Sequence, residues 1–272
     1  MSILICQPIF GPIDRVTERN INSLISLGKY LKERKVANVE VCFGGWCSTK
    51  QQWDKILPII KDYFGKKEIL SFKDNVGKAV IVNTLTKKFL KPYHKYIMSV
   101  DSDILFSQDN DEMFQRLVNM ASKSESIKSR PFGLIGLQQQ GQGCHYKTCY
   151  ENTNTYSTVI NGKTFNEKMV WPNQPSGIAG GCIFVSRRAW ETVGGYRVMG
   201  VYAGDDAYFL MDLGQRGFTW QMSDSIPIIH PPENDEEYAK WKVKVCQRDS
   251  GVTKQSIKDQ IKEASDFWQN RK

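Results

Sequence analysis

Residues 96–106, "YIMSVDSDILF", carry the pattern that decides the fold. The apolar run that ends at Val100 predicts a buried strand. Asp101, Ser102 and Asp103 follow it directly, before apolar residues return. Burying a carboxylate costs free energy, and two carboxylates so close together also repel each other. The stretch therefore raises the question of which chemistry needs a pair of acids at the end of a core strand.

Strand-like and helix-like segments alternate along the chain up to this point. Apolar runs predict strands at residues 2–10, 38–45 and 68–72, besides the strand at 96–100. Helical spacing predicts helices at residues 17–35, with Thr17 as a cap, at 49–65, ending at Gly65, and at 78–90. This order predicts an α/β fold with a mostly parallel central sheet flanked by helices. In such sheets ligands bind beyond the carboxyl ends of the strands, where Asp101 and Asp103 stand.

The second half of the chain is less regular. Strands are predicted at residues 131–137 and 180–186 and before His230, and Asn161-Gly162 predicts the turn of a hairpin. One helix is expected at residues 187–193, and another starts at Asp205 and Asp206 and ends at Gly217. The tail beyond residue 233 predicts one or two amphipathic helices.

The composition of the chain limits the classes of protein to which it can belong. No apolar run approaches the roughly 20 residues that cross a bilayer, and the N-terminus lacks the basic start of a signal peptide. The seven cysteines are scattered and odd in number, which favours reduced thiols. We therefore expect a cytoplasmic protein, with attachment to a membrane surface left open.

The net charge of +8 is uneven along the chain. Residues 1–100 hold 17 Lys and Arg against 8 Asp and Glu, a balance of +9, and the rest of the chain holds 20 against 21. A basic first half suggests an anionic ligand such as a phosphate, although a solvated set of helix faces explains the charge equally well.

The acidic residues and one histidine suggest a divalent metal site. Asp101 and Asp103 follow a strand, Asp205 and Asp206 start a helix, and His230 follows a late strand. Carboxylate and imidazole ligands suit Mg²⁺ or Mn²⁺, and a bound dication would offset the repulsion between neighbouring acids. An Asp-x-Asp sequence alone is a weak signal, since about half of such matches are surface acids or turn residues.

Four segments, in order, carry a family resemblance. They are "DNVGKAVIVNTL" with Asn75, Gly77 and Asn83, "VDSD", "GIAGGCIFVSRRAWETVGGY" followed by "GDDAYFLMDLGQRGF", and "IIHPP". Over residues 1–232 the chain resembles the nucleotide-sugar-dependent glycosyltransferases with the GT-A fold, especially the family 2 group. The resemblance implies a GT-A domain at 1–232, with a donor-binding half at 1–106 and an acceptor-binding and catalytic half at 107–232. Residues 233–272 would form a helical extension.

The resemblance also implies roles for individual residues. It implies Mn²⁺ or Mg²⁺ as cofactor, held by Asp101, Asp103 and His230, and Asp206 as the general base of an inverting transfer. It implies donor-binding residues at Pro8, Asn75, Gly77, Lys78 and Ser102. It implies acceptor-binding residues at Gly180, Gly181, Asp205, Trp171 and Tyr196. A UDP-sugar is the expected donor.

Several of these residues have plainer explanations. Asp206 fits a helix N-terminal acid, His230 a turn residue, and Lys78 a solvated helix face. Core packing explains Trp171 and Tyr196 at least as well as sugar stacking does. The chain also departs from the family, because "CFGGWCST" lacks the acid that often contacts uracil, and because Asp205 replaces a glutamate.

The sequence leaves alternatives open for the acceptor and for the class of reaction. A saccharide or a lipid-linked glycan is the expected acceptor, and hydroxymethylated DNA is an alternative for a basic chain. A nucleotidyltransferase is less favoured, because "QPIFGPIDR" offers one glycine where a phosphate loop needs several. A non-catalytic sugar-binding relative is a further alternative. Zinc binding at "CHYKTC" would need distant ligands and is a minor alternative.

Overall fold

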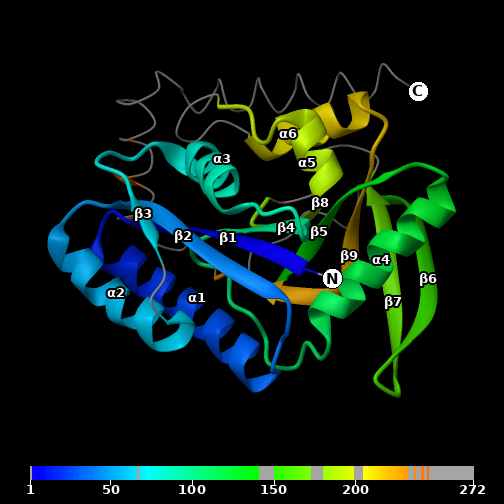
Figure 1. The fold of residues 1–272 in the computed structure, drawn as a ribbon, viewed down its shortest axis with the longest axis horizontal. Coiled ribbons are helices and arrows are strands. Elements are labelled where there is room, and N and C mark those ends of the chain that lie inside the picture. The colour runs from blue at the N-terminus through cyan, green and yellow to red at the C-terminus, as the bar shows by residue number, and fades with distance from the viewer. Residues whose placement is uncertain are drawn as a thin grey trace.

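The computed structural model describes residues 2–65, 68–140, 150–172, 180–198 and 205–231, together with residues 236, 240, 241 and 244. Within these residues a single sheet has the strand order β3-β2-β1-β4-β8-β5-β9-β7-β6 (Figure 1). The strands are β1 Ser2–Gly11, β2 Val39–Cys47, β3 Ile69–Ser71, β4 His94–Val100, β5 Phe132–Gln140, β6 Tyr150–Ile160, β7 Lys163–Pro172, β8 Cys182–Ser186 and β9 Thr219–Ile229.

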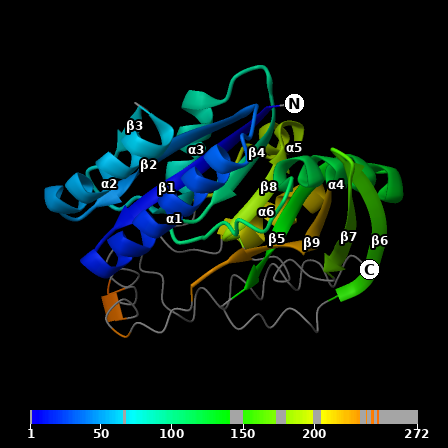
Figure 2. The same ribbon diagram turned by 90° about the horizontal axis from the view of Figure 1, so that it is seen from below.

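Helices cover both faces of this sheet. They are α1 Asp14–Glu33, α2 Lys50–Phe64, α3 Gly77–Phe89, α4 Met113–Lys128, α5 Arg187–Val193 and α6 Asp205–Gln215. Buried side chains of α1, α2 and α4 form one hydrophobic cluster, and those of α3, α5 and α6 form a second. Figures 1 and 2 show the two groups on opposite faces of the sheet, which makes three layers.

The strand directions bring distant segments to one edge of the sheet. Strands β1, β2, β3 and β4 are parallel, β8 is antiparallel to both β4 and β5, and β5 is parallel to β9. The carboxyl ends of β4 and β9 and the start of β8 therefore meet at the same edge. This arrangement confirms the α/β fold with a central sheet flanked by helices.

The helix ends follow local sequence signals, with one exception. Thr49 and Gln52 form a capping box at the start of α2, and Gly65 ends that helix with φ +74°. The expectation that Thr17 caps α1 is wrong, because the helix starts at Asp14 after an extended Ile13. The Thr17 hydroxyl instead donates to the Ile13 carbonyl from inside the helix.

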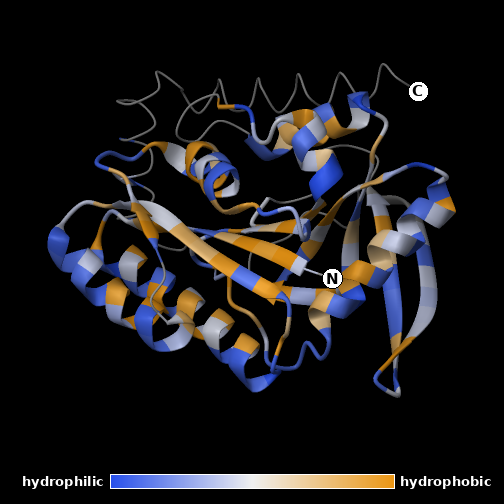
Figure 3. Ribbon diagram, viewed as in Figure 1, coloured by the Kyte–Doolittle hydropathy of each residue, from blue (hydrophilic) through white to orange (hydrophobic). Residues whose placement is uncertain are grey.

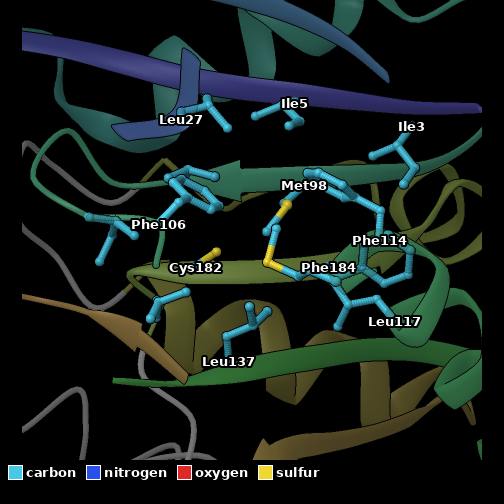
Figure 4. Packing of buried hydrophobic residues seen from close by; sticks show 14 of the residues in the cluster. Ile3, Ile5, Leu27, Met98, Phe106, Phe114, Leu117, Leu137, Cys182 and Phe184 are labelled. Atoms are coloured by element: carbon cyan, nitrogen blue, oxygen red, sulfur yellow. The ribbon is translucent and has the colours of Figure 1, made fainter. Parts of the chain in front are cut away.

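The hydrophobic core consists of two clusters, one on each face of the sheet, so that the central strands are buried on both sides. Residues 3–9 of β1 are all buried, as expected for a parallel strand covered by helices on both faces. Figure 3 shows apolar residues along β1, β2 and β4 and on the helix faces that point toward them. Figure 4 shows Ile5, Met98 and Phe184, from three adjacent strands, in one cluster with Leu27 of α1 and Leu117 of α4.

Strands β6 and β7 form the expected hairpin at one end of the sheet. Asn161 and Gly162 make its two-residue turn with φ +49° and +77°. A buried ion pair fastens the hairpin to α4, because Arg116 Nε lies 2.5 Å and its Nη2 3.0 Å from the two carboxylate oxygens of Glu167. The Ser225 hydroxyl donates to the same carboxylate from β9.

Two expectations fall outside the described residues. These are the alternative zinc segment at 144–149 and most of the extension at 233–272, of which residues 236, 240, 241 and 244 are helical. In the described part of the chain, none of the helices combines the length and the apolar character needed to cross a membrane.

Replacing Arg116 tests the ion pair between α4 and the hairpin. Arg116→Met leaves the Glu167 carboxylate charged and buried without its partner, so we expect the free energy of unfolding to fall by about 3–5 kcal/mol. Urea unfolding measures the change. The matched control is Lys88→Met, which removes an exposed partner of Glu68 and should cost a small fraction of that amount. Equal losses in the two variants would contradict a special role for the buried pair.

Candidate active site

A turn at the end of β4 separates Asp101 from Asp103. The Ile104 amide lies 3.3 Å from the Asp101 carbonyl, which closes a turn over Ser102 and Asp103. In a continuing strand residues 101 and 103 would point to the same face of the sheet. The turn breaks this alternation, so the two carboxylates reach different surroundings.

The Asp101 carboxylate faces Lys78 of α3. Lys78 Nζ lies 2.8 Å from Asp101 Oδ1 and 3.3 Å from Asp206 Oδ1 at the start of α6, and it donates a 2.7 Å hydrogen bond to the Gly180 carbonyl. The ammonium group therefore joins the end of β4, the segment before β8 and α6. Lys78 is not a solvated residue, because only 18% of its side chain is exposed.

Burial and charge shift the pKa values of this cluster. Burial raises the pKa of Asp101 to about 6, with Lys78 opposing the shift and Asp206 adding to it. Burial, together with the neighbouring charge of Asp206, raises the pKa of Asp205 to about 7. Burial disfavours the charged form of Lys78, but Asp101 and Asp206 outweigh this effect and raise its pKa well above the usual value. Lys78 is thus a permanent cation among acids, two of which take up protons near neutral pH.

The Asp103 carboxylate faces the opposite way, toward His230. Leu105 and Ile229 exchange two backbone hydrogen bonds of 2.8 and 3.0 Å, which ties the segment after the turn to the end of β9. His230 follows β9 directly, and its Nε2 lies 3.6 Å from Asp103 Oδ1. Arg19 of α1 approaches the other oxygen of Asp103, with Nη1 at 4.0 Å from Oδ2.

Asp103 and His230 fit a divalent cation as two of its ligands. One carboxylate oxygen and one imidazole nitrogen converge within 3.6 Å, and Mg²⁺ or Mn²⁺ usually takes few protein ligands and completes its shell with water and phosphate oxygens. Asp101 does not join them in this conformation, because Lys78 occupies its carboxylate. Accordingly, no group of three or more His, Cys, Asp or Glu side chains among the described residues could hold a metal ion.

Gly180 and Gly181 allow a close approach of backbone to the acids. The Gly181 carbonyl accepts a 2.7 Å hydrogen bond from the Asp101 amide, which extends the pairing of β4 with β8. A Cβ atom at Gly180 would lie 1.8 Å from the Asp206 carboxyl group, and one at Gly181 would lie 2.5 Å from Gln139 Nε2. Glycine at position 180 therefore leaves the space in which Asp206 stands, and glycine at position 181 leaves the space of the Gln139 amide.

The expected donor-binding residues divide into two groups. Asn75 and Gly77 lie at the start of α3, where Asn75 Oδ1 accepts a 3.2 Å hydrogen bond from the Gly77 amide. Among the described residues no hydrogen-bond acceptor faces the buried Asn75 Nδ2, so this donor is available to a ligand. Ser102 presents its carbonyl to Asn20, and Pro8 is buried near the carboxyl end of β1, two residues beyond the pairing of Cys6 with Ser99 of β4.

The structure favours packing for the two aromatic residues assigned to the acceptor. Tyr196 is 2% exposed and lies against the rings of Trp190 and Phe209. Asn83 fixes its backbone through two hydrogen bonds of 2.8 and 2.9 Å. Trp171 is 7% exposed at the end of β7, with Lys128 Nζ 4.4 Å from the centroid of its ring. Neither ring offers an open face for stacking on a sugar, and their acceptor role stays a prediction.

Two residues of α1 belong to the site and carry no local signal in the sequence. Arg19 faces Asp103, and Asn20 Nδ2 donates a 2.9 Å hydrogen bond to the Ser102 carbonyl while its Oδ1 accepts one from the Phe10 amide. Both sit in an ordinary amphipathic helix pattern. Only the placement of α1 after β1, at the same edge of the sheet, could have suggested them.

Replacing Asp205 tests the electrostatics of the cluster. Its folded-state pKa lies above the usual value, so this carboxyl favours the folded state at acidic pH, and the benefit disappears as the pH rises through about 7. Asp205→Asn removes the charge, and we expect a higher Tm than wild type at pH 8, with a smaller difference at pH 5. Thermal unfolding at both values measures this change.

The matched control for this prediction lies on the same helix. Asp212 pairs with Arg197, so Asp212→Asn removes a satisfied charge and should not raise the Tm at pH 8. A Tm gain in Asp205→Asn that is the same at pH 5 and pH 8 would mean that the charge of Asp205 is not the cause.

No protein-family model matches the chain, and no curated protein matches it. Solved structures of S. aureus TarS are similar. TarS 1–349 is 13% identical with a TM-score of 0.58, and the match covers 100% of this chain and 71% of that one. TarS 1–349 in complex with UDP-GlcNAc is 13% identical with a TM-score of 0.60, covering 88% and 61%. The complex with UDP is 12% identical with a TM-score of 0.58, covering 97% and 70%.

The chain spans between 43% and 71% of the lengths of these TarS chains. At such low identity the likeness is one of fold. The match with TarS 1–349 covers the whole length of the chain. It shows that the chain has the GT-A fold.

Proposed function

We propose that the protein is a glycosyltransferase that moves a sugar from a UDP-sugar to an acceptor hydroxyl with inversion, with Mn²⁺ or Mg²⁺ as its cofactor. The observation that carries the proposal is the meeting of Asp103 and His230 with Asp206 and Lys78 at one edge of a GT-A sheet. The complexes of the similar TarS with UDP-GlcNAc and with UDP support the choice of donor.

In this proposal the residues around the turn bind the donor diphosphate. Asp103 and His230 would hold the metal, which when bound supplies a Lewis acid for the leaving diphosphate. The start of α3 offers Asn75 Nδ2, which has no hydrogen-bond partner in the described part of the chain, and helix N-termini favour anions. Asp101 keeps Lys78 at the edge of the site, so that the ammonium group lies within the reach of a bound phosphate.

Asp206 is the proposed general base. It starts α6 with 35% of its side chain exposed, so an acceptor hydroxyl can approach it from solvent. The Lys78 ammonium lies 3.3 Å from its carboxylate and fixes the position of this group, and a carboxylate can accept the proton of an attacking hydroxyl. Asp205 beside it is more deeply placed and is proposed to position the acceptor together with Gly180 and Gly181.

The acceptor is proposed to be a saccharide, either free or linked to a lipid. The four acidic residues at this edge are more compatible with a neutral, hydroxyl-rich acceptor than with the phosphate backbone of DNA, which they would repel. Hydroxymethylated DNA is therefore the less favoured acceptor.

A panel of nucleotide sugars tests the donor and the metal together. We expect UDP-sugars to raise the Tm in the presence of Mn²⁺ and much less with chelator, because a ligand that binds only the folded state stabilises it. We also expect slow metal-dependent release of UDP from one of them. If no nucleotide sugar shifts the Tm with either metal, the transferase proposal is wrong.

Asp206→Asn tests the base. The amide keeps the shape of the side chain but cannot take a proton, so we expect kcat to fall by about 10²–10⁴-fold while donor affinity stays near that of wild type. Asp212→Asn, on the same helix and away from the cluster, is the matched control. Full activity in Asp206→Asn would rule out this assignment, and retention of the donor's anomeric configuration in the product would rule out inversion.

A further inference from the structure

Strand β6 forms one end of the sheet and leaves a long edge open. It pairs with β7 alone among the described residues, and Figures 1 and 2 show it beyond β7 at the end of the sheet. The pairing shifts register between Tyr150 and Asn152 and is regular from there to Ile160. This regular edge is roughly 30 Å long at about 3.4 Å per residue. An edge of that length carries a row of N–H and C=O groups that can pair with another strand.

One hydrogen bond shows which backbone groups of β6 point away from β7. Thr155 lies opposite Lys168 of β7, and the Lys168 amide donates a 3.1 Å hydrogen bond to the Ser225 hydroxyl of β9. The Thr155–Lys168 pair therefore exchanges no hydrogen bond, and Thr155 directs its own N–H and C=O to the open side. Such pairs alternate along an antiparallel ladder. The other residues of β6 with the same direction are Thr153, Ser157 and Val159.

The regular part of β6 has none of the features that usually protect an edge strand. Proteins protect edges with prolines, lysines, inward-pointing charges, bulges or very short strands. Residues 152–160, "NTNTYSTVI", contain neither a proline nor a charged residue. The side chains of Thr153, Thr155 and Ser157 are exposed, and Val159 is 67% exposed. At the opposite end of the sheet β3 has only three residues, Ile69–Ser71, and is protected by its shortness.

The strand is complementary to a second copy of itself. Two β6 strands can pair antiparallel about a two-fold axis, which places the same edge on both sides of the contact. When the side-chain faces continue across the contact, odd-numbered residues lie opposite odd-numbered ones, so threonine, serine and valine meet on the exposed face. Threonine and serine pair favourably across strands, and no like charges oppose each other because residues 152–160 are uncharged. The pairing also closes after two copies, since the short β3 offers no second long edge.

We propose that β6 pairs antiparallel with β6 of a second copy of this chain. The two sheets then form one continuous sheet in a dimer with two-fold symmetry. The candidate site residues come from β4, from the end of β9 and from helices on the other side of β7, so the pairing uses none of them. A single pair of strands makes a small interface, and we expect a dissociation constant of roughly 1–100 µM.

A proline at the open side of β6 tests the proposal. Thr155→Pro removes an N–H that β7 does not use, so the hairpin keeps its own hydrogen bonds while the outer edge loses a donor in each copy. We expect the dissociation constant of the dimer to rise by at least about tenfold, as measured by sedimentation equilibrium of the full chain. The matched control is Thr155→Val, which keeps the N–H and the shape of the side chain and should dimerise as wild type does.

Charged variants test the identity of the partner. A chain with both Thr155→Lys and Ser157→Lys places like charges across the contact, and so does a chain with both Thr155→Glu and Ser157→Glu. We expect each to be a monomer at concentrations where wild type is a dimer. An equimolar mixture of the two should form a heterodimer that weakens with added salt. Loss of folding cannot produce this recovery, because each variant then fails in the mixture as well.

The sedimentation results either support or overturn the proposal. Wild type that stays monomeric up to about 200 µM contradicts it, whether the edge is free or is covered by another segment or another protein. A wild-type dimer that persists in Thr155→Pro and in both charged variants uses a different surface, and the proposal is then wrong. Two monomeric charged variants that do not associate when mixed also contradict pairing of β6 with itself.

Discussion

The contact of one ammonium group with two carboxylates holds the site of this protein together. Lys78 reaches Asp101 at the end of β4 and Asp206 at the start of α6, and it also bonds the Gly180 carbonyl. Three segments that are far apart in the chain therefore meet at one charge. Removing that charge would leave buried acids facing each other, which is why a permanent cation is needed even without a ligand.

The strand and helix ends that form this site can be predicted from the sequence, because they follow from local patterns. An apolar run that ends in Asp101 and Asp103 marks both a core strand and its carboxyl end. The alternation of strands and helices places the other strand ends at the same edge. It follows that His230, directly after β9, and Asp206, at the start of α6, could be expected near the acids before any contact was known.

The partners of each charge are not predictable in the same way, because they depend on contacts across the layers. Lys78 fits a solvated helix face as well as an ion pair, and nothing in the sequence pattern around Arg19 distinguishes it from Arg15 of the same helix. Whether a given side chain is buried also depends on contacts across the layers and cannot be predicted from the local sequence. Trp171 and Tyr196 are large aromatic residues near promising segments, and only the packing of α4 and of Trp190 shows that both are enclosed.

The turn at residues 101–104 explains why the chain places two acids so close together. Extended backbone would direct both carboxylates to one face, where they would share a single counter-charge. The turn instead gives Asp101 to Lys78 on the α3 side and Asp103 to His230 and Arg19 on the α1 side. One acid is thereby neutralised by the protein itself, and the other keeps an open contact with imidazole, which suits a cation that arrives with a substrate. A pair that looks redundant in the sequence thus has two separate electrostatic roles in the fold.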